Sequence, residues 1–259
     1  MSEDTQETSG QRWKIKIEYF GRDFCGWQKQ PEVISVQSVL EEALYKISGE
    51  TIKTVAAGRT DSGVHALGQV VHFDMIKTIK PQRILYGLNY HLKQYDVAVL
   101  SAEAVEPDFH ARFSAKERSY IYRILCRPAC PVVDKGRVWW IKHQLNMDAM
   151  QEAANVLVGE HDFTSFRASL CQSKSPVKTI DEITFSRKEV INGGYEIVMF
   201  VKARSFLHHQ VRNIIGTLKL VGEGKWTAED VRSALEAKTR CKAGPTAPPE
   251  GLYFLEVFY

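Results

Sequence analysis

The stretch Gly58-Arg59-Thr60-Asp61-Ser62-Gly63-Val64-His65-Ala66 places an arginine and an aspartate between two glycines, with an apolar segment on either side. A turn with glycine at both ends is typical of backbone at positive φ or of backbone that approaches a ligand closely. An ordinary hairpin loop is the alternative, because aspartate often accepts hydrogen bonds from the backbone of its own turn. The choice between a catalytic loop and a structural loop depends on the rest of the chain.

Around this stretch, the first half of the chain has the periodicities of strands and amphipathic helices. Apolar residues alternate with charged ones from Trp13 to Tyr19, which predicts a half-buried strand. Ser35 and Gly49 bound a helix whose apolar residues recur at three- and four-residue spacing. The remaining elements predicted here are strands at Ile52–Ala57, Gln69–Asp74 and Val97–Val105, and a helix after Pro81.

The second half repeats this plan. A strand is predicted at Ser119–Leu125, and Asn146 caps a helix that Gly159 ends. Two further strands are joined through Asn192-Gly193-Gly194, a sequence typical of hairpin turns. The other predicted elements are strands at Thr179–Ser186, Tyr195–Arg204 and Tyr253–Tyr259, a helix over Leu207–Val221, and a helix that Thr227 caps and that runs through Lys238.

Two strand–helix–strand halves predict an α+β fold, with helices on one side of a mainly antiparallel, mixed sheet. We expect two similar ferredoxin-like halves that share this sheet, because no linker of low complexity separates them, and an active-site cleft between them. The predicted divisions are a disordered tail over 1–10, an N-terminal half over 11–108 that carries the glycine-bracketed turn, and a C-terminal half over 109–259.

The totals describe an ordinary globular protein with a weakly basic balance. The 259 residues are 44% hydrophobic and 25% charged, and the formal net charge of +3 permits an anionic partner without demanding one. Five scattered cysteines argue against a disulfide framework and for a reducing compartment. No apolar run approaches the ~18 residues of a membrane span, and the polar N-terminus is unlike a signal peptide. We therefore expect a cytoplasmic protein without membrane attachment.

Several motifs in a fixed order resemble those of the TruA family of tRNA pseudouridine synthases. The resemblance runs from about Arg12 to the C-terminus and includes the glycine-bracketed turn. The other motifs that carry it are Tyr19-Phe20-Gly21 with Gly26-Trp27-Gln28, Phe109-His110-Ala111-Arg112-Phe113-Ser114-Ala115, Asp162-Phe163-Thr164-Ser165-Phe166-Arg167, Phe206-Leu207-His208-His209-Gln210-Val211-Arg212-Asn213, and Glu250-Gly251-Leu252-Tyr253.

This resemblance implies an isomerase that converts uridine to pseudouridine in tRNA. The bond from ribose C1′ to uracil N1 breaks, the base rotates, and C1′ is rejoined through C5. The resemblance makes Asp61 the essential catalytic residue and implies no cofactor and no metal. Two routes stay open, addition of Asp61 to C1′ and proton removal from C2′, and both require an ionised carboxylate in a sheltered pocket.

Four further residues acquire substrate-binding roles from the resemblance. Arg212 is implied as the ion-pair partner of Asp61, since an unpaired buried carboxylate would protonate instead. Tyr120 is implied to stack on the target uracil, and Leu252 to form the opposite apolar wall. Arg59 is implied to fill the gap that the flipped nucleotide leaves.

RNA contacts are expected mainly at phosphates. The family pattern assigns them to two segments, Phe109, His110, Ala111, Arg112 and Phe113, and Leu170, Cys171, Gln172, Ser173 and Lys174. Lys174 departs from the arginine expected in relatives and so lacks the bidentate fork. Basic residues interleaved with aromatic ones also favour a binding groove in the middle of the chain, at Lys116, Arg118, Arg123, Arg127, Lys135 and Arg137.

His208 and His209 are adjacent within the predicted helix from Leu207, so we expect their side chains to point in different directions and not to share a metal. Packing or contacts to the RNA backbone are the expected roles.

The leading hypothesis is a homodimeric synthase that acts on the 3′ side of the anticodon stem-loop, at tRNA positions 38, 39 and 40. The alternatives are a non-catalytic tRNA-binding or tRNA-folding protein of the same fold, and an unrelated aspartate-dependent hydrolase. The set of Asp61, Arg59, Tyr120 and Arg212 argues against a pure binder. No matching second carboxylate or metal motif favours the hydrolase.

Overall fold

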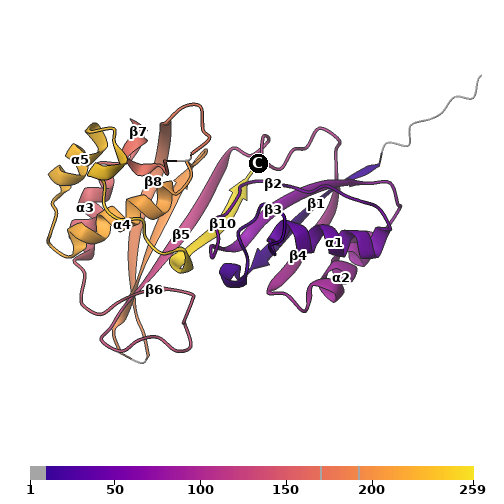
Figure 1. The fold of residues 1–259 in the computed structure, drawn as a ribbon, viewed down its shortest axis with the longest axis horizontal. Coiled ribbons are helices and arrows are strands. Elements are labelled where there is room, and N and C mark those ends of the chain that lie inside the picture. The colour runs from indigo at the N-terminus through magenta and orange to yellow at the C-terminus, as the bar shows by residue number, and fades with distance from the viewer. Residues whose placement is uncertain (1–9, 170, 192) are drawn as a thin grey trace, which may run out of the picture. The chain divides into compact units, whose positions relative to one another are not determined.

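The structure, a computed structural model, describes residues 10–169, 171–191 and 193–259 (Figure 1). These residues form two compact units. Unit 1 comprises the chain up to Ser62 and Ala66–Ala115, and unit 2 comprises Gly63–His65 and Lys116–Tyr259. The chain therefore changes units within the glycine-bracketed turn, directly after Asp61 and Ser62.

Unit 1 is a small antiparallel sheet with two helices. Its strands are β1 (Gln11–Tyr19), β2 (Val55–Ala56), β3 (His65–Met75) and β4 (Val97–Val105), in the order β4-β1-β3, and β2 pairs with β3. A 3-10 turn (η1, Gly21–Asp23) follows β1. The helices α1 (Val36–Ser48) and α2 (Pro81–Leu92) pack against one another beside this sheet (Figure 1). Alternate residues of β1 are buried, as the sequence predicts.

The first helix shows why these boundaries form. The Ser35 side chain accepts a hydrogen bond from the Ser38 backbone N–H, and Ser38 reciprocates at the Ser35 backbone, which together make a capping box. Gly49 ends the helix in the left-handed region, at φ 81°. Both ends of α1 are therefore as predicted.

Unit 2 contains more strands and three helices. Its strands are β5 (Glu117–Cys126), β6 (Trp139–Ile141), β7 (Gly159–Asp162), β8 (Val177–Glu189), β9 (Tyr195–Ala203) and β10 (Leu252–Phe258). The order is β10-β5-β9-β8-β7, all antiparallel, and β6 adds a short parallel pairing to β5. Its helices are α3 (Met147–Asn155), α4 (Gln210–Gly222) and α5 (Ala228–Glu236), with 3-10 turns η2 (Thr164–Phe166), η3 (Arg240–Lys242) and η4 (Pro249–Gly251).

Ten strands and five α-helices in the described residues confirm the predicted α+β class and its mixed, mainly antiparallel strand pairing. The sharing of one sheet by the two halves and the cleft between them stay predictions. Within the same described residues, no helix has both the length and the hydropathy that a membrane span requires.

Several predicted boundaries are wrong. The last long helix begins at Gln210 instead of Leu207, because His209 adopts a left-handed conformation at φ 63°. The helix after Asn146 ends at Asn155, and Gly159, at φ 105°, instead begins β7.

Other elements differ in length or were not predicted. The strand expected at Ile52–Ala57 shrinks to Val55–Ala56, and the short strands β6 and β7 were not predicted. Residues 1–9 of the predicted tail and Asn192 of the predicted hairpin turn lie outside the described residues.

We expect Gly216→Ala to destabilise unit 2, although alanine is normally the better helix former by about 1 kcal/mol. A Cβ at Gly216 would overlap the backbone carbonyl of Pro245, which approaches α4 at this point. Relief of the overlap requires a backbone shift, so we expect a loss of about 1–3 kcal/mol in thermal or denaturant unfolding. Ser233→Ala, at an exposed site of α5, is the control and should be neutral. A Gly216→Ala protein as stable as the parent would contradict this view of the packing.

Candidate active site

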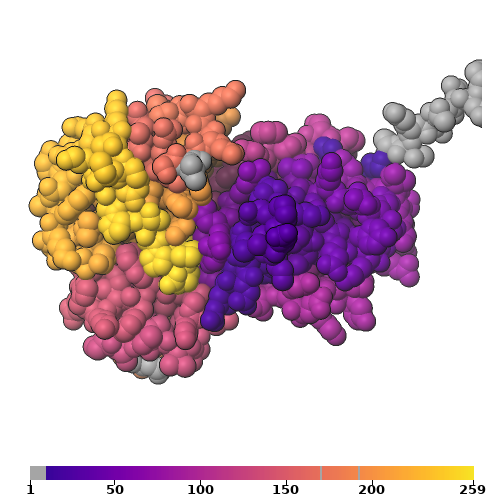
Figure 2. Space-filling view, in the orientation of Figure 1, coloured from indigo at the N-terminus to yellow at the C-terminus, as the bar shows by residue number. Residues whose placement is uncertain are grey.

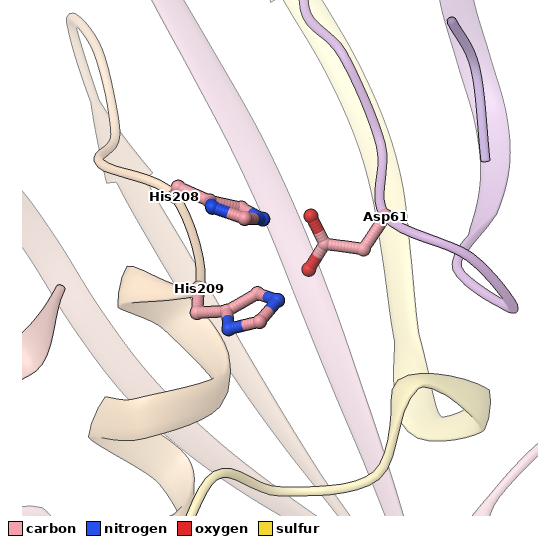
Figure 3. Close-up of side chains that lie close together, drawn as sticks. All are labelled: Asp61, His208 and His209. Carbon is pink, nitrogen blue, oxygen red and sulfur yellow. The ribbon is translucent and has the colours of Figure 1, made fainter. Parts of the chain in front are cut away.

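Asp61 lies in the loop that follows β2, and its side chain extends from that loop (Figure 3). The loop alternates in exposure: Arg59 is exposed, Thr60 is buried and Asp61 is half-buried. Thr60 thus anchors the loop, while its two charged neighbours remain accessible to different degrees. This pattern suits a carboxylate that must be partly sheltered and an arginine that must reach outward.

Thr60 anchors the Asp61 loop through hydrogen bonds of its carbonyl and its hydroxyl. The backbone N–H of Trp27 donates to the Thr60 carbonyl at 3.0 Å, and the hydroxyls of Thr60 and Tyr19 share a buried hydrogen bond of 2.7 Å. Burial raises the pKa of the Tyr19 hydroxyl to about 12, so it stays protonated. On the other side, the Gln69 side chain donates to the Gly58 carbonyl at 2.7 Å. Residues on β1 and β3 therefore hold both arms of the loop.

Gly26 is required for this arrangement. Its φ is +88°, and a Cβ at this position would lie 2.7 Å from the Thr60 carbonyl oxygen. Both observations favour glycine, because another residue would strain the backbone and displace the loop. The Gly26-Trp27 motif therefore packs against the Asp61 loop and holds it in place. Ser62 adds a further contact between the two loops, since its hydroxyl donates to the Phe24 carbonyl at 3.2 Å.

Tyr120 and Leu252 lie on one face of the sheet in unit 2. Tyr120 is opposite Phe254 in the β5–β10 pairing and Leu252 is opposite Tyr122, which makes Tyr120 and Leu252 diagonal neighbours on the same face. The Tyr120 ring, only 8% exposed, meets the rings of Phe206 and Phe254 edge-on at 5.1 and 5.0 Å. These two phenylalanines hold the orientation of Tyr120, and sequence reasoning assigned neither of them a role.

Arg212 stands in the first turn of α4, where a loop carbonyl orients it. Its Nε donates to the Ala247 carbonyl at 2.8 Å, and the Ala247 N–H donates back to the Arg212 carbonyl at 3.1 Å. The nearby Tyr122 hydroxyl donates to Pro248 at 2.7 Å. Burial raises the pKa of Tyr122 well above its usual range, which the positive charge of Arg212 partly opposes. Asp61 belongs to unit 1 and Arg212 to unit 2, and the ion pair between them stays a prediction.

The two histidines before α4 contradict one expectation. Their rings lie 4.1 Å apart between centroids at an interplanar angle of 46°, so the side chains do not point in different directions (Figure 3). The left-handed backbone of His209 brings the rings together, since the pair precedes the helix instead of lying within it.

The segment 109–113 forms a compact turn within unit 1. The His110 Nδ1 accepts hydrogen bonds from the backbone N–H groups of Arg112 and Phe113, both at 3.2 Å. Its ring also stacks on Phe113, with centroids 4.3 Å apart. Phe113 nevertheless remains 76% exposed, and the Arg112 guanidinium lies over its ring. An exposed aromatic ring beside a cation is a surface suited to RNA.

A buried histidine, His72, holds this turn through a hydrogen bond to its backbone. The Nδ1 of His72, on β3, accepts the backbone N–H of Ala111 at 3.1 Å, and both residues are buried. Burial, aided by the charges of His110 and Arg12, lowers the pKa of His72 to about 4. Sequence reasoning missed His72, because a single histidine inside an apolar strand gives no signal of what it contacts.

The second predicted RNA segment is only partly described. Leu170 lies outside the described residues. Cys171 and Ser173 are half-buried, whereas Gln172 and Lys174 are exposed. The Cys171 N–H donates to the Ala168 carbonyl, and the Ala168 N–H donates to the His208 carbonyl at 2.9 Å. This segment is therefore tied to the strip of chain that leads into α4.

Four of the six basic residues in the middle of the chain make structural contacts through their side chains. Arg118 is buried and donates to the Arg204 carbonyl, and Arg123 forms a bidentate pair with Glu196 at 2.6 and 3.0 Å. Arg127 donates to the Ala129 carbonyl. Arg137 donates to the Val133 carbonyl at 3.2 Å. It is nevertheless exposed, as are Lys116 and Lys135.

The sequence matches the family model described as tRNA pseudouridine synthase over residues 15–114 and 153–259. It is 55% identical to tRNA pseudouridine synthase A of Rhodospirillum centenum over 249 residues, which cover 96% of this chain and 100% of that protein. It is 54% identical to the protein of the same name from Rhodospirillum rubrum, over 95% of this chain and 87% of that one. The chain belongs to the TruA family of tRNA pseudouridine synthases.

Family membership confirms the resemblance on which the site residues were chosen. The matched residues include Asp61 and its loop, the turn at 109–113, and Arg212 and Leu252. Tyr120 lies in the interval 115–152 between the two matched segments.

The buried His72 generates a prediction about pH. Its pKa in the folded protein, about 4, is below the ordinary value of 6.5, so the unfolded chain binds a proton first as the pH falls. Folding stability should therefore be complete above about pH 6.5 and decline between pH 6.5 and 4. His65, whose pKa burial also lowers to about 4, contributes in the same direction.

His72→Gln should weaken this pH dependence, because the amide oxygen can accept from Ala111 without titrating. The measurement is the free energy of unfolding in denaturant at a series of pH values. His91→Gln, a half-buried histidine of α2, serves as the control and should leave the profile unchanged. An identical decline in the parent and in His72→Gln would show that His72 does not titrate as described.

Proposed function

We propose that this chain isomerises uridine to pseudouridine in tRNA, with Asp61 as the catalytic residue. Membership in a family of tRNA pseudouridine synthases, along nearly the whole chain, carries the proposal. The geometry of the Asp61 loop supports it, since Thr60 and Gly26 hold a half-buried carboxylate in one defined position.

The reaction is an internal rearrangement that requires no net redox change. The C1′–N1 bond of the target uridine breaks, a C1′–C5 bond forms, and C5 loses a proton while N1 gains one. Asp61 acts on the ribose, either by addition to C1′ or by removal of a proton from C2′. In both routes the carboxylate must be ionised, and a nearby cation such as Arg212 favours the ionised form.

The target base enters a pocket bounded by Tyr120 and Leu252. The edge-on contacts of Phe206 and Phe254 hold the Tyr120 ring against rotation, so its face is presented in a constant orientation for stacking. Extrusion of a base from a stacked stem costs a few kcal/mol. We assign the replacement of the extruded base to Arg59, which is exposed and lies two residues before Asp61.

The substrate segment proposed is the 3′ side of the anticodon stem-loop, at positions 38, 39 and 40. The turn at 109–113, with its exposed Arg112 and Phe113, and the exposed Gln172 and Lys174 supply the contacts to phosphates and ribose. We further propose a homodimer that acts in the cytoplasm, where its tRNA substrate resides.

Replacement of Asp61 is the direct test. Asp61→Asn keeps the size of the side chain and removes its charge, so release of tritium from tRNA labelled at uracil C5 should fall by at least about 10³-fold. Binding of tRNA, measured by filter retention, should change less than about threefold. Equal tritium release from the parent and the variant would remove Asp61 from the chemistry. Tight tRNA binding with no release from either protein would favour the non-catalytic binder.

Arg212→Lys tests the second charged group. Lysine keeps the positive charge but lacks an Nε–H for the Ala247 carbonyl and lacks the planar fork. We expect kcat to fall about 10- to 100-fold while KM for tRNA changes little. Arg232→Lys, an exposed arginine of α5, is the matched control. A rise in KM at constant kcat would instead identify Arg212 as a phosphate contact.

A further inference from the structure

The solvent-facing side of α2 carries an unusual set of side chains. Arg83, Tyr86, Tyr90 and Lys93 follow one another at spacings of three, four and three residues, which places them on a single face of the helix. Tyr86 is 70% exposed and Tyr90 is 69% exposed. We call these four residues the α2 stripe. Figure 2 shows the solvent surface of unit 1, to which α2 contributes.

Packing within unit 1 does not account for the stripe. The opposite face of α2 supplies the core residues, since Ile84, Leu88 and Leu92 are all fully buried. Gly87 makes the close approach to α1, where a Cβ would lie 2.9 Å from the Ile47 side chain. The fold therefore uses one side of the helix and leaves the two large tyrosines in solvent. The exposure of two tyrosine rings one helical turn apart therefore requires an explanation other than packing, because exposed apolar surface is costly.

The charge around the stripe is positive. The twelve residues of α2 include no aspartate or glutamate, and exposed Lys77 and Lys80 precede the helix. Lys93, which ends the stripe, places its ammonium 5.5 Å from the centre of the Tyr90 ring.

Two acidic side chains in and just after α1, those of Glu42 and Glu50, already have partners. Glu42 pairs with Lys46 at 2.6 Å, and Glu50 accepts the backbone N–H groups of Ile76 and Lys77. The exposed Asp96 follows three residues after Lys93, but the four cations Lys77, Lys80, Arg83 and Lys93 outnumber it along this stretch of the chain.

In unit 1, α2 packs against the edge strand β4, whereas the Asp61 loop follows β2, which pairs with β3. We therefore infer that the α2 stripe binds the sugar–phosphate backbone of the substrate tRNA at a place outside the anticodon stem-loop. The inference rests on the proposed function, because it takes tRNA as the ligand. Arginine donates bidentately to phosphate, and tyrosine hydroxyls donate to phosphate and sugar oxygens. Lysines and arginines that neutralise phosphates release counterions, which supplies most of the affinity of such contacts.

The lysines around the stripe favour RNA over a protein partner. Tyrosine and arginine are enriched in protein–protein interfaces, but lysine is depleted there, and three lysines stand in or next to the stripe. From Arg83 to Lys93 the stripe rises by about 15 Å, at 1.5 Å per helical residue. That length suits a run of several phosphates on one strand. A contact of this kind reads shape and charge instead of sequence, as expected where only the position of the tRNA body matters.

The experiment compares two RNAs. The triple variant Arg83→Ala/Tyr86→Ala/Tyr90→Ala and the parent are titrated with a full-length tRNA and with an isolated anticodon stem-loop. The Kd for tRNA should rise about tenfold in the variant, and the slope of log Kd against log salt should fall by about one. The Kd for the stem-loop should stay within about twofold, and kcat at saturating tRNA should not change. Lys188→Ala/Ile191→Ala, at exposed sites of unit 2, is the matched control.

Each other outcome overturns the inference in a recognisable way. An unchanged Kd for tRNA in an active variant refutes the stripe and leaves the proposed function intact. Equal losses for tRNA and stem-loop would place the contact in the anticodon arm. A loss of affinity that coincides with a change of oligomeric state, measured by light scattering, would make the stripe a protein interface. If the parent modifies neither RNA, the proposed function itself fails.

Discussion

The close approach of Gly26 to the carbonyl of Thr60 is the contact on which the candidate active site depends. It lets the backbone N–H of Trp27 bind that carbonyl at 3.0 Å, and it leaves the Thr60 hydroxyl to meet Tyr19. Asp61 is the next residue, so its position follows from a main-chain contact between two loops. A side chain at Gly26 would push the loops apart and move the carboxylate, whatever residue carried it.

In unit 2, a main-chain contact likewise orients a charged residue, Arg212. The main-chain carbonyl of Ala247 accepts a hydrogen bond from the Arg212 Nε–H, and a partly buried hydrogen-bond network holds the loop that carries this carbonyl. In this network the Asn213 side-chain oxygen accepts from Arg240 at 3.1 Å and from Thr246 at 2.7 Å. Arg240 also donates to the Gly244 carbonyl at 2.8 Å, and burial lowers its pKa below the usual range. The loop that carries Ala247 is thereby held against α4, and it leads directly to Leu252.

The sequence predicted the elements whose causes are local and failed where the causes are not. The ends of α1 were predictable because Ser35 and Gly49 act on the helix that contains them. The start of α4 was not, because His209 takes a left-handed backbone that apolar periodicity does not reveal. Asp61 and Arg212 could be chosen from the sequence because they lie in motifs that the family model matches. The contacts that hold the site residues in place could not be predicted. His72 bonds the backbone of Ala111, and Arg212 bonds the backbone of Ala247. Both alanines are distant in the chain from their partners, and neither has a side chain that would mark it.

The hydrogen bonds that orient Arg212 and that support the 109–113 turn both use backbone atoms of alanines. Nearly half of the aligned positions differ from each of two relatives that are 54% and 55% identical. Every residue except proline offers the same carbonyl and N–H, so these hydrogen bonds do not require a particular side chain. Ala111 and Ala247 are both fully buried, however, so only a small side chain fits at either position without moving the backbone. The constraint also falls on the few positions where a side chain or its absence is indispensable. Gly26 and Gly216 must stay without a Cβ for the loops to approach, and His72 must present an acceptor to a buried N–H. A handful of packing positions therefore constrains the loop of Asp61 in unit 1 and the orientation of Arg212 in unit 2, while the exposed side chains of α2 are under no such packing constraint.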